Sequence, residues 1–401
     1  MYTNVQSYQV LQRDADDKAR VQTSNGKVIE LAVGGPYTVG EADHVLVGDL
    51  WVLAGQSNME GIGDLIDEEK PSPFVHSFQS REQWAQAEEP LHWLVESPRL
   101  VHHVLWGFDR VPESIPERDP QRVKGTGLGL TFAKERYART GVPVGLIPSA
   151  HGGTSMQQWD PQLRDQGGAS LYGALYERVK AVGGRVAGVL WYQGESDCNP
   201  EGVEHYHQRM HTLVQSLRSD LNNPDLPFYY VQIGGFISEE GPDGWNGIRE
   251  LQRTFQHAEP GIAMVSAIDL ELDDLIHVGT QGLKRLGRRL ADQVDGQRTP
   301  DVVSVTPELE QMRIHVTYRP VRGGLRSIGR PAGFSLRTGD GRELPLIHKT
   351  TLEGDTATLR LIADALPSDT YLWYGWGLNP YCNITDGADA AIPAFGPWKV
   401  S

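Results

Sequence analysis

Apolar residues in the middle of the chain come in short unbroken runs, and longer amphipathic segments separate these runs. Each run is rich in Val, Ile and aromatic side chains and is bounded by Gly or Pro. This pattern is typical of strands that are buried on both faces of a parallel sheet. The pattern predicts a five-stranded parallel sheet with strands at Leu50–Ala54, Val142–Ala150, Val186–Tyr192, Phe228–Ile233 and Ile262–Ile268.

The segments between these runs predict helices, because their apolar residues recur at spacings of three and four. One such stripe contains Val203, Tyr206, Met210, Leu213, Leu217 and Leu221, and a second follows Thr280. A third helix is predicted over Gly129–Arg139, with Gly141 as its left-handed cap. Strands joined by helices in this way predict an α/β fold, a three-layer α/β/α sandwich.

Strict alternation of apolar and polar residues marks both ends of the chain and predicts short antiparallel strands there. We therefore expect an N-terminal β region at 1–46, an α/β/α domain at 47–298 and a C-terminal β domain at 299–401. Residues 62–125 are an exception, because they have weak periodicity and contain Trp84, Trp93 and Trp106. A long irregular insertion in a compact domain commonly serves function.

The composition and net charge of the chain exclude several kinds of binding partner. The chain has 401 residues, of which 39% are hydrophobic, so it can bury a large core and is not a disordered protein. Its net charge of −15 predicts repulsion from phosphate backbones and anionic lipid, so we expect neither nucleic acid nor a membrane as partner. With two cysteines, no apolar leader in the first thirty residues and no long apolar stretch, we expect a soluble cytoplasmic protein. The oligomeric state stays open.

Polar segments follow several predicted strands at the sheet edge where open α/β sheets bind their ligands. They are Gly55-Gln-Ser-Asn-Met-Glu-Gly61, His151-Gly-Gly-Thr-Ser155, Gln193-Gly-Glu-Ser-Asp197 and Asp274-Leu-Ile-His277. A serine nucleophile needs a base that takes its proton and an acid that orients the base. Ser57 lies on the turn after a buried strand, and His277 supplies an imidazole. Asp273 competes with Asp274 as the orienting acid, and the three-residue offset to the histidine favours Asp274.

The same segments contain donors for the negative charge that develops on a carbonyl oxygen during attack. Ser57 and Gly153 offer backbone N–H groups, and Gln193 offers a side-chain amide. Together they would form an oxyanion hole, in which one donor is worth about 3–4 kcal/mol.

Five short blocks occur in a fixed order: GQSNMEG, GLG, PVGLIPSAHGGTS, WYQGESD and DLIH. In this order they resemble the SGNH-hydrolase superfamily, and within it the sialate O-acetylesterase and acetyl xylan esterase branch, over residues 47–295. The resemblance implies a flavodoxin-like fold. It also implies a cofactor-free carbohydrate O-acetylesterase that forms an acetyl-enzyme intermediate. It implies Ser57 as nucleophile, His277 as general acid and base and Asp274 as its orienter, with Ser57, Gly153 and Gln193 as oxyanion donors.

Three features leave the substrate side of this site open. His151 stands where such sequences often have Trp, so the pocket wall differs from the usual pattern. Glu195 could act as a second carboxylate on His277 or the substrate, or form a buried structural hydrogen bond. Trp159 could stack on a sugar ring or lie in the core.

Two other classes of function are less consistent with the residues. An α/β-hydrolase lipase or peptidase requires G-x-S-x-G, which is absent at Ser57. A non-catalytic carbohydrate-binding protein would not need Ser57, Asp274 and His277. A metal site is not expected, because the closely spaced histidines flank the apolar stripe of their helix, as residues of a solvated face do; they are His205, His207 and His211. Together with the resemblance, these residues predict a metal-independent enzyme, and the resemblance implies an acetylated carbohydrate as its partner.

Overall fold

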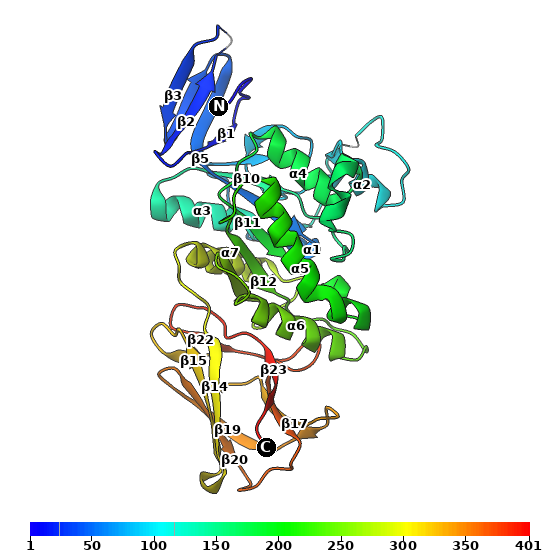
Figure 1. The fold of residues 1–401 in the computed structure, drawn as a ribbon, viewed down its shortest axis with the longest axis vertical. Coiled ribbons are helices and arrows are strands. Elements are labelled where there is room, and N and C mark those ends of the chain that lie inside the picture. The colour runs from blue at the N-terminus through cyan, green and yellow to red at the C-terminus, as the bar shows by residue number, and fades with distance from the viewer. Residues whose placement is uncertain (24, 116) are drawn as a thin grey trace. The chain divides into compact units, whose positions relative to one another are not determined.

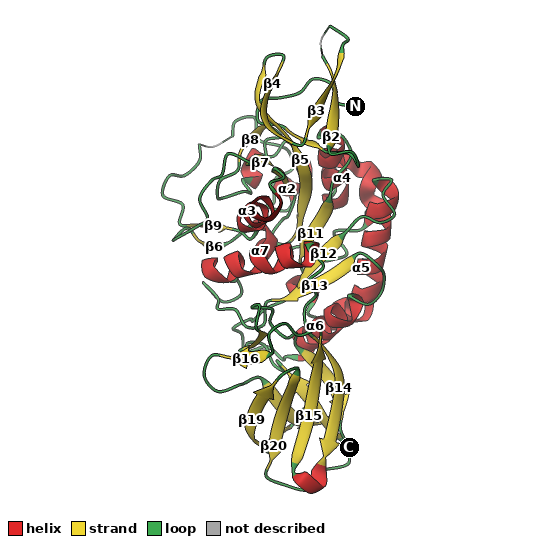
Figure 2. Ribbon diagram, turned by 90° about the vertical axis from the view of Figure 1, so that its left-hand side faces the viewer, coloured by secondary structure: helices red, strands yellow, loops and turns green. Residues whose placement is uncertain are grey.

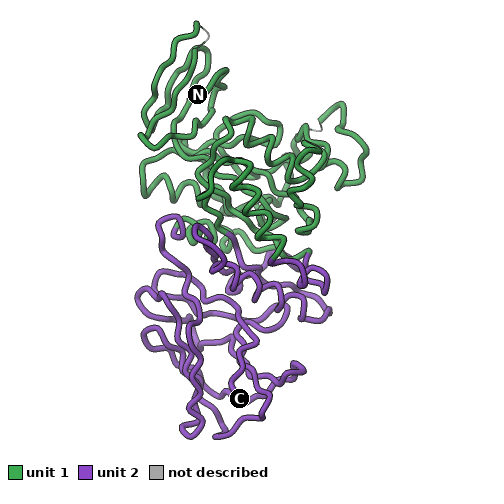
Figure 3. The backbone as a smooth tube through the Cα atoms, in the orientation of Figure 1, with its two compact units in different colours: residues 1–196, 208–229, 277–291 green, residues 197–207, 230–276, 292–401 purple. Residues whose placement is uncertain are grey.

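The computed structural model of the chain describes residues 1–23, 25–115 and 117–401. The protein is a mixed α/β protein whose central sheet is rich in parallel strands (Figure 1). Its contacts divide it into two compact units (Figure 3), and the first contains residues 1–196, 208–229 and 277–291. The second contains residues 197–207, 230–276 and 292–401. Within the described ranges, no helix has both the length and the apolar character to cross a membrane.

The sheet of the first unit contains three of the predicted strands. Its strands hydrogen-bond in the order β11 (Gly188–Tyr192), β5 (Ala42–Gly55), β10 (Val144–Pro148), β7 (Val75–Phe78) and β8 (Trp84–Gln86). All pairings from β11 to β7 are parallel, and β8 is antiparallel to β7. Every residue of β10 and β11 is buried, as expected for strands covered on both faces.

Strands β7 and β8 extend the sheet beyond the predicted strands, and they come from the segment 62–125. The sequence of β7 is Val-His-Ser-Phe, which is too short and too polar to read as a buried strand. The structure nevertheless buries all of it, and the ring Nδ1 of His76 lies 2.7 Å from the carbonyl oxygen of Tyr8. Other short elements of this segment are β6 (Gly63–Asp64), a 3₁₀ turn (Leu94–Glu96), α2 (Leu100–Val104) and β9 (Lys124–Thr126).

Helices cover both faces of this sheet (Figure 2). Helices α3 (Gly129–Thr140) and α7 (Thr280–Val294) lie on one side of β5 and β11, and α4 (Leu171–Ala181) and α5 (Pro200–Asp220) lie on the other. The predicted helices at α3, α5 and α7 are confirmed, and the predicted cap Gly141 has a left-handed φ of 69°.

The N-terminal strands belong to the first unit and pack around a small apolar cluster of their own. They are β1 (Val10–Gln12), β2 (Lys18–Gln22), β3 (Val28–Ala32) and β4 (Gly34–Val39). Strand β5 pairs with β1 and β4 near its start and with β10 and β11 near its end. It therefore runs without interruption from this region to Gly55, the first residue of the GQSN block. The domain boundaries at 46 and 298 stay predictions.

The second unit contains the last predicted strand, the C-terminal β region and most of the fourth predicted strand, of which Phe228 and Tyr229 belong to the first unit. Strand β13 (Ile262–Ser266) neighbours β12 (Phe228–Gln232), which is followed by α6 (Asp243–Phe255). One antiparallel sheet has the order β14 (Asp301–Glu308), β15 (Arg313–Arg319), β20 (Thr356–Leu361) and β19 (Ile347–Glu353). Another has the order β18 (Glu343–Leu344), β17 (Phe334–Thr338), β21 (Thr370–Tyr374) and β23 (Phe395–Lys399). Strands β16 (Leu325–Ser327) and β22 (Ile384–Asp386) form a pair, and one apolar cluster joins residues of both sheets.

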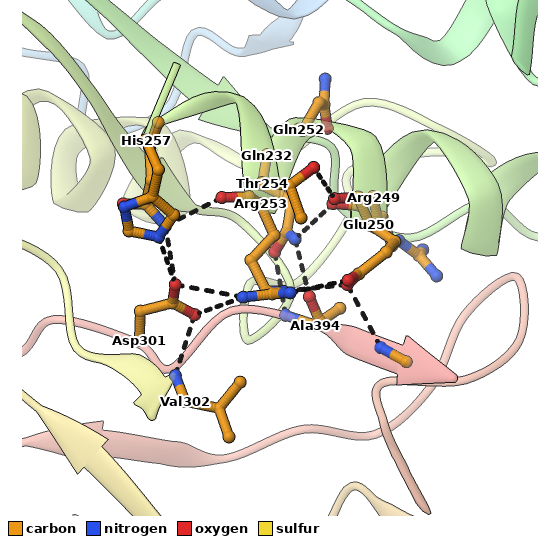
Figure 4. A network of polar contacts seen from close by, with 12 residues as sticks. Gln232, Arg249, Glu250, Gln252, Arg253, Thr254, His257, Asp301, Val302 and Ala394 are labelled. Carbon is orange, nitrogen blue, oxygen red and sulfur yellow. Dashed lines mark hydrogen bonds and ion pairs between the residues drawn. The ribbon is translucent and has the colours of Figure 1, made fainter. Parts of the chain in front are cut away.

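A polar network fixes α6 to the C-terminal β region inside the second unit (Figure 4). The guanidinium of Arg253 donates to both carboxylate oxygens of Asp301 at 3.1 Å and to Glu250 at 2.7 and 2.9 Å. The amide of Gln232 exchanges two hydrogen bonds of 2.9 Å with the backbone of Ala394. Since these polar groups are buried or partly buried and satisfied, the contact specifies one packing of helix and sheets.

Candidate active site

The predicted nucleophile lies on a sharp turn directly after β5. Gly55 has a φ of 129°, and a Cβ at this position would lie 2.2 Å from the carbonyl oxygen of Tyr192 on β11. Only glycine allows the two backbones to approach so closely. The extended residue Gln56 follows, and Ser57 is the first residue of the short helix α1 (Ser57–Glu60). Ser57 is partly exposed, in contrast to the buried residues before it.

Two of the predicted oxyanion donors have unused N–H groups beside this serine. The N–H groups of Ser57 and Gly153 donate no hydrogen bond to any residue that the structure describes, and neither does the Ser57 hydroxyl. Gly153 is exposed, has a left-handed φ of 69° and has open space around its Cα. A Cβ on the neighbouring Gly152 would lie 3.4 Å from Ser57 Cβ. The loop that carries Gly153 therefore lies close to the Ser57 side chain, and the role of these N–H groups as oxyanion donors stays a prediction.

Glu60 binds the loop that contains these glycines. Its Oε2 accepts a hydrogen bond of 2.8 Å from the N–H of Gly152. The same loop is held on its other side, where the N–H of His151 donates to the carbonyl oxygen of Gly55 at 3.1 Å. Burial raises the pKa of the Glu60 carboxyl to about 7, against the opposing effects of the Gly152 hydrogen bond and the charge of Arg122. The charge on Glu60 thus changes near neutral pH.

Asn58 contacts two other blocks of the predicted site. Its Nδ2 donates to Glu195 Oε1 at 2.7 Å, and its Oδ1 accepts from the N–H of Val278 at 3.0 Å. Asn58 is 2% exposed and Glu195 is 9% exposed. Val278 directly follows His277, so the side chain next to the nucleophile binds the backbone next to the predicted base.

Gln56 and Gln193 connect the remaining blocks. The Oε1 of Gln56 accepts hydrogen bonds of 3.3 Å from the N–H groups of Gly194 and Ser196. Gln193 is fully buried, and its Nε2 donates to the carbonyl oxygen of Thr154 at 3.1 Å. One hydrogen of this amide is therefore directed at the glycine loop. The role of Gln193 as a third oxyanion donor stays a prediction.

Trp159 supports the glycine loop from inside the first unit. It is fully buried, and its ring N–H donates to Thr154 Oγ at 3.0 Å. Thr154 Oγ in turn donates to the carbonyl oxygen of His151 at 2.7 Å. This chain of contacts fixes both ends of the loop that carries Gly153.

His151 pairs with a second histidine from the segment 62–125. Its Nδ1 lies 2.9 Å from Nδ1 of His102, and the two rings are almost parallel. Burial lowers the pKa of His151 to about 4 and that of His102 well below its ordinary value. Both imidazoles are therefore neutral at neutral pH, and one donates to the other.

Two tryptophans of the segment 62–125 have different surroundings. Trp106 is 45% exposed, and its ring centroid lies 5.6 Å from that of His151. Trp93 instead has the guanidinium groups of Arg118 and Arg122 within 4.8 and 4.7 Å of its ring. The ring of Trp93 is thus engaged by cation–π contacts, and Trp106 presents an aromatic surface beside the loop.

The predicted acid and base fall in different units. His277 begins the last segment of the first unit, and Asp274 belongs to the second. The Oδ1 of Asp274 accepts a hydrogen bond of 3.0 Å from the N–H of Ile276. The orientation of His277 by Asp274 stays a prediction. Among the described residues, no group of three or more His, Cys, Asp or Glu side chains is arranged to hold a metal ion.

Sequence reasoning missed Asn58 and Glu60 as parts of the site. Their partners lie far away in sequence, so no local spacing indicates the contacts. One signal was available: an amide and a carboxylate stand between two glycines in a short turn that directly follows a buried strand. Polar side chains in such a place need hydrogen-bond partners.

Comparisons with known proteins agree with the ordered blocks. A family model described as carbohydrate esterase, sialic acid-specific acetylesterase, matches residues 47–295. A protein of Arabidopsis thaliana named probable carbohydrate esterase is 28% identical over 288 residues, which cover 64% of this chain and 96% of the plant protein. Human sialate O-acetylesterase is 23% identical over 266 residues, which cover 56% of this chain and 48% of the human protein.

A solved structure extends the comparison beyond the matched family region. The carbohydrate acetylesterase from Xanthomonas citri aligns with a TM-score of 0.72 at 22% sequence identity. The alignment covers 98% of each chain. At this identity the likeness shows a shared fold.

Proposed function

This chain belongs to the carbohydrate esterase family of sialic acid-specific acetylesterases, and from this premise we propose that it removes O-linked acetyl groups from a sugar by means of Ser57. As a member of this family it is a carboxylic ester hydrolase. The proposal adds the nucleophile, the base and the covalent intermediate. It also adds the finer architecture, a three-layer sandwich around the five predicted strands with small β regions at both ends.

In the first half of the reaction, Ser57 becomes acetylated. His277 takes the proton of the Ser57 hydroxyl while the oxygen attacks the acetyl carbonyl carbon. The carbonyl oxygen gains negative charge, which the N–H groups of Ser57 and Gly153 and the amide of Gln193 stabilise. The bond between the acetyl carbon and the sugar oxygen then breaks, and His277 returns its proton to that oxygen. Asp274 keeps the imidazole in the productive tautomer.

In the second half, water releases acetate. His277 accepts a proton from a water molecule while its oxygen attacks the acetyl-Ser57 ester. The same donors stabilise the second tetrahedral intermediate. When it collapses, the proton passes from His277 to Ser57 Oγ and restores the free enzyme. No oxidant, reductant or metal is required for either step.

The observation that carries this proposal is the pair of unused N–H groups beside Ser57. An exposed backbone N–H binds water until a ligand replaces it, so both donors are open to the carbonyl oxygen of a substrate. Ser57 and Gly153 come from two segments that the structure brings to one place, with space beside Gly153. Two open donors around a partly exposed hydroxyl support Ser57 as a nucleophile whose substrate oxygen they would bind.

The surface formed by Trp106 and His151 supports a sugar as the leaving group. An exposed indole beside the glycine loop offers an apolar face, and sugar rings present C–H groups that pack on such faces. His151 backs this ring and belongs to the loop of Gly153. We therefore place the sugar on the Trp106 side of the loop and the acetyl group at Ser57.

The test combines two substrates with one variant. The wild-type enzyme should release acetate from an acetylated oligosaccharide and from p-nitrophenyl acetate, and Ser57→Ala should lose both activities. Ser155→Ala is the matched control, since this serine lies in the glycine loop and its hydroxyl contacts Gln158. Activity that survives in Ser57→Ala would contradict the proposal.

A further inference from the structure

Asn58 joins three blocks of the site through one buried side chain. It stands next to Ser57, donates to Glu195 at 2.7 Å and accepts from the Val278 N–H at 3.0 Å. Both partners are remote in sequence, and all three residues belong to the first unit. With 2% of its surface exposed, Asn58 has little access to water as a replacement partner.

The chemistry of these contacts fixes the orientation of the amide. A backbone N–H only donates, so the side-chain oxygen of Asn58 must face Val278. The NH₂ group must then face Glu195, whose carboxylate only accepts when ionised. Glu195 thus selects the one amide orientation in which Asn58 can bind the backbone beside His277.

We propose that Asn58 is a positioning residue that sets the place of His277 relative to Ser57, and that Glu195 anchors Asn58. This inference rests on the proposed function, because it assumes that Ser57 and His277 react together. In this proposal Glu195 acts only as a hydrogen-bond acceptor for Asn58, and an uncharged amide oxygen can do the same. A second catalytic carboxylate would require the negative charge itself.

A pair of complementary substitutions separates these roles. Asn58→Asp places a carboxylate against Glu195 and removes the donor, so kcat should fall about ten- to hundredfold, as for other broken buried hydrogen bonds to charged groups. Glu195→Gln keeps an oxygen that accepts from Asn58, so kcat should stay within about threefold of wild type. In the double variant, the introduced glutamine amide can donate to the introduced aspartate and restore the contact with reversed polarity. The kcat of this double variant should recover to within about fivefold of wild type.

The assay is steady-state hydrolysis of p-nitrophenyl acetate, a small substrate that makes few contacts beyond the acetyl group. A displaced base lowers kcat, and KM should change by less than about twofold. Circular dichroism and thermal melting report whether each variant is folded. Asn58→Ser, which removes both contacts without adding charge, replaces Asn58→Asp if the latter does not fold, and its kcat should fall by a similar factor.

Several outcomes would overturn the inference. Wild-type kcat in folded Asn58→Ser or Asn58→Asp would show that Asn58 does not position the base. A large loss of kcat in Glu195→Gln without recovery in the double variant would show that Glu195 acts through its charge. Failure of the proposed function itself looks different, because Ser57→Ala would then retain activity whatever the Asn58 variants do.

Discussion

Glu60 offers a direct test of how the oxyanion loop is held. The perturbation is Glu60→Ala, which removes the acceptor of the Gly152 N–H, compared with Glu60→Gln, which keeps a neutral acceptor. A hydrogen bond to a charged group contributes about 1.5–3 kcal/mol. If the transition state loses this much stabilisation because the loop that carries Gly153 is no longer held in place, kcat falls about ten- to hundredfold. The loss should stay at or below the roughly 10²–10³-fold effect of deleting an oxyanion donor.

The pH dependence supplies an independent readout of the same residue. Burial raises the pKa of Glu60 to about 7, so the carboxylate that binds Gly152 is lost as the pH falls through this value. Arg122 is the charged group that acts on Glu60 among the described residues. The acid limb of kcat/KM in the wild type should therefore contain the ionisation of Glu60 at about pH 7. Glu60→Gln should lack this ionisation.

The assay is the kcat/KM profile for p-nitrophenyl acetate between about pH 5 and 9, with thermal melting as the control for folding. Glu60→Gln should keep at least about a fifth of wild-type kcat, since an amide oxygen still accepts from Gly152. Two results would refute the reasoning. One is a folded Glu60→Ala enzyme within about twofold of wild type, and the other is an unchanged acid limb in Glu60→Gln.

Two further predictions concern the substrate and stability. Trp106→Ala should lower kcat/KM for an acetylated oligosaccharide about five- to thirtyfold but hardly change it for p-nitrophenyl acetate. Equal losses on both substrates would count against a sugar-binding role of Trp106. Trp93→Ala should instead lower the melting temperature. Burial raises the pKa of Glu89 from 4.5 to about 8, so the folded chain keeps a proton that the unfolded chain releases. The free energy of unfolding should therefore fall as the pH rises from about 4.5 to 8, and Glu89→Gln should raise the melting temperature at about pH 9 more than at about pH 5. An equal change at both pH values would argue against this ionisation.

The strands were predictable where burial leaves a local signature. The apolar runs around Leu50, Leu190 and Val265 are strands in the structure, because a strand covered on both faces has little choice but apolar residues. Strand β7 was not predictable, since His76 and Ser77 are buried in it. His76 can be buried because its ring Nδ1 binds the carbonyl oxygen of Tyr8, and the sequence does not identify that partner.

The residues of the site were predictable to a similar extent. The blocks around Ser57 and Gly153 were recognisable because turns at strand ends have fixed residue requirements, such as the close approach at Gly55. The contacts of Asn58 and Glu60 were not, because each depends on residues that the fold brings from about a hundred or more positions away. Tertiary structure alone could show that the side chains flanking the nucleophile bind the loops of the predicted base and oxyanion hole.

The acetyl-enzyme intermediate tests the central claim most directly. An acetylated oligosaccharide is mixed with the enzyme, the reaction is quenched in acid within its first turnover, and the digested protein is analysed by mass spectrometry. We expect the mass of one acetyl group on the peptide that contains Ser57, in wild type and not in Ser57→Ala. An acetyl group on another residue, or turnover of the sugar ester by Ser57→Ala, would contradict the account.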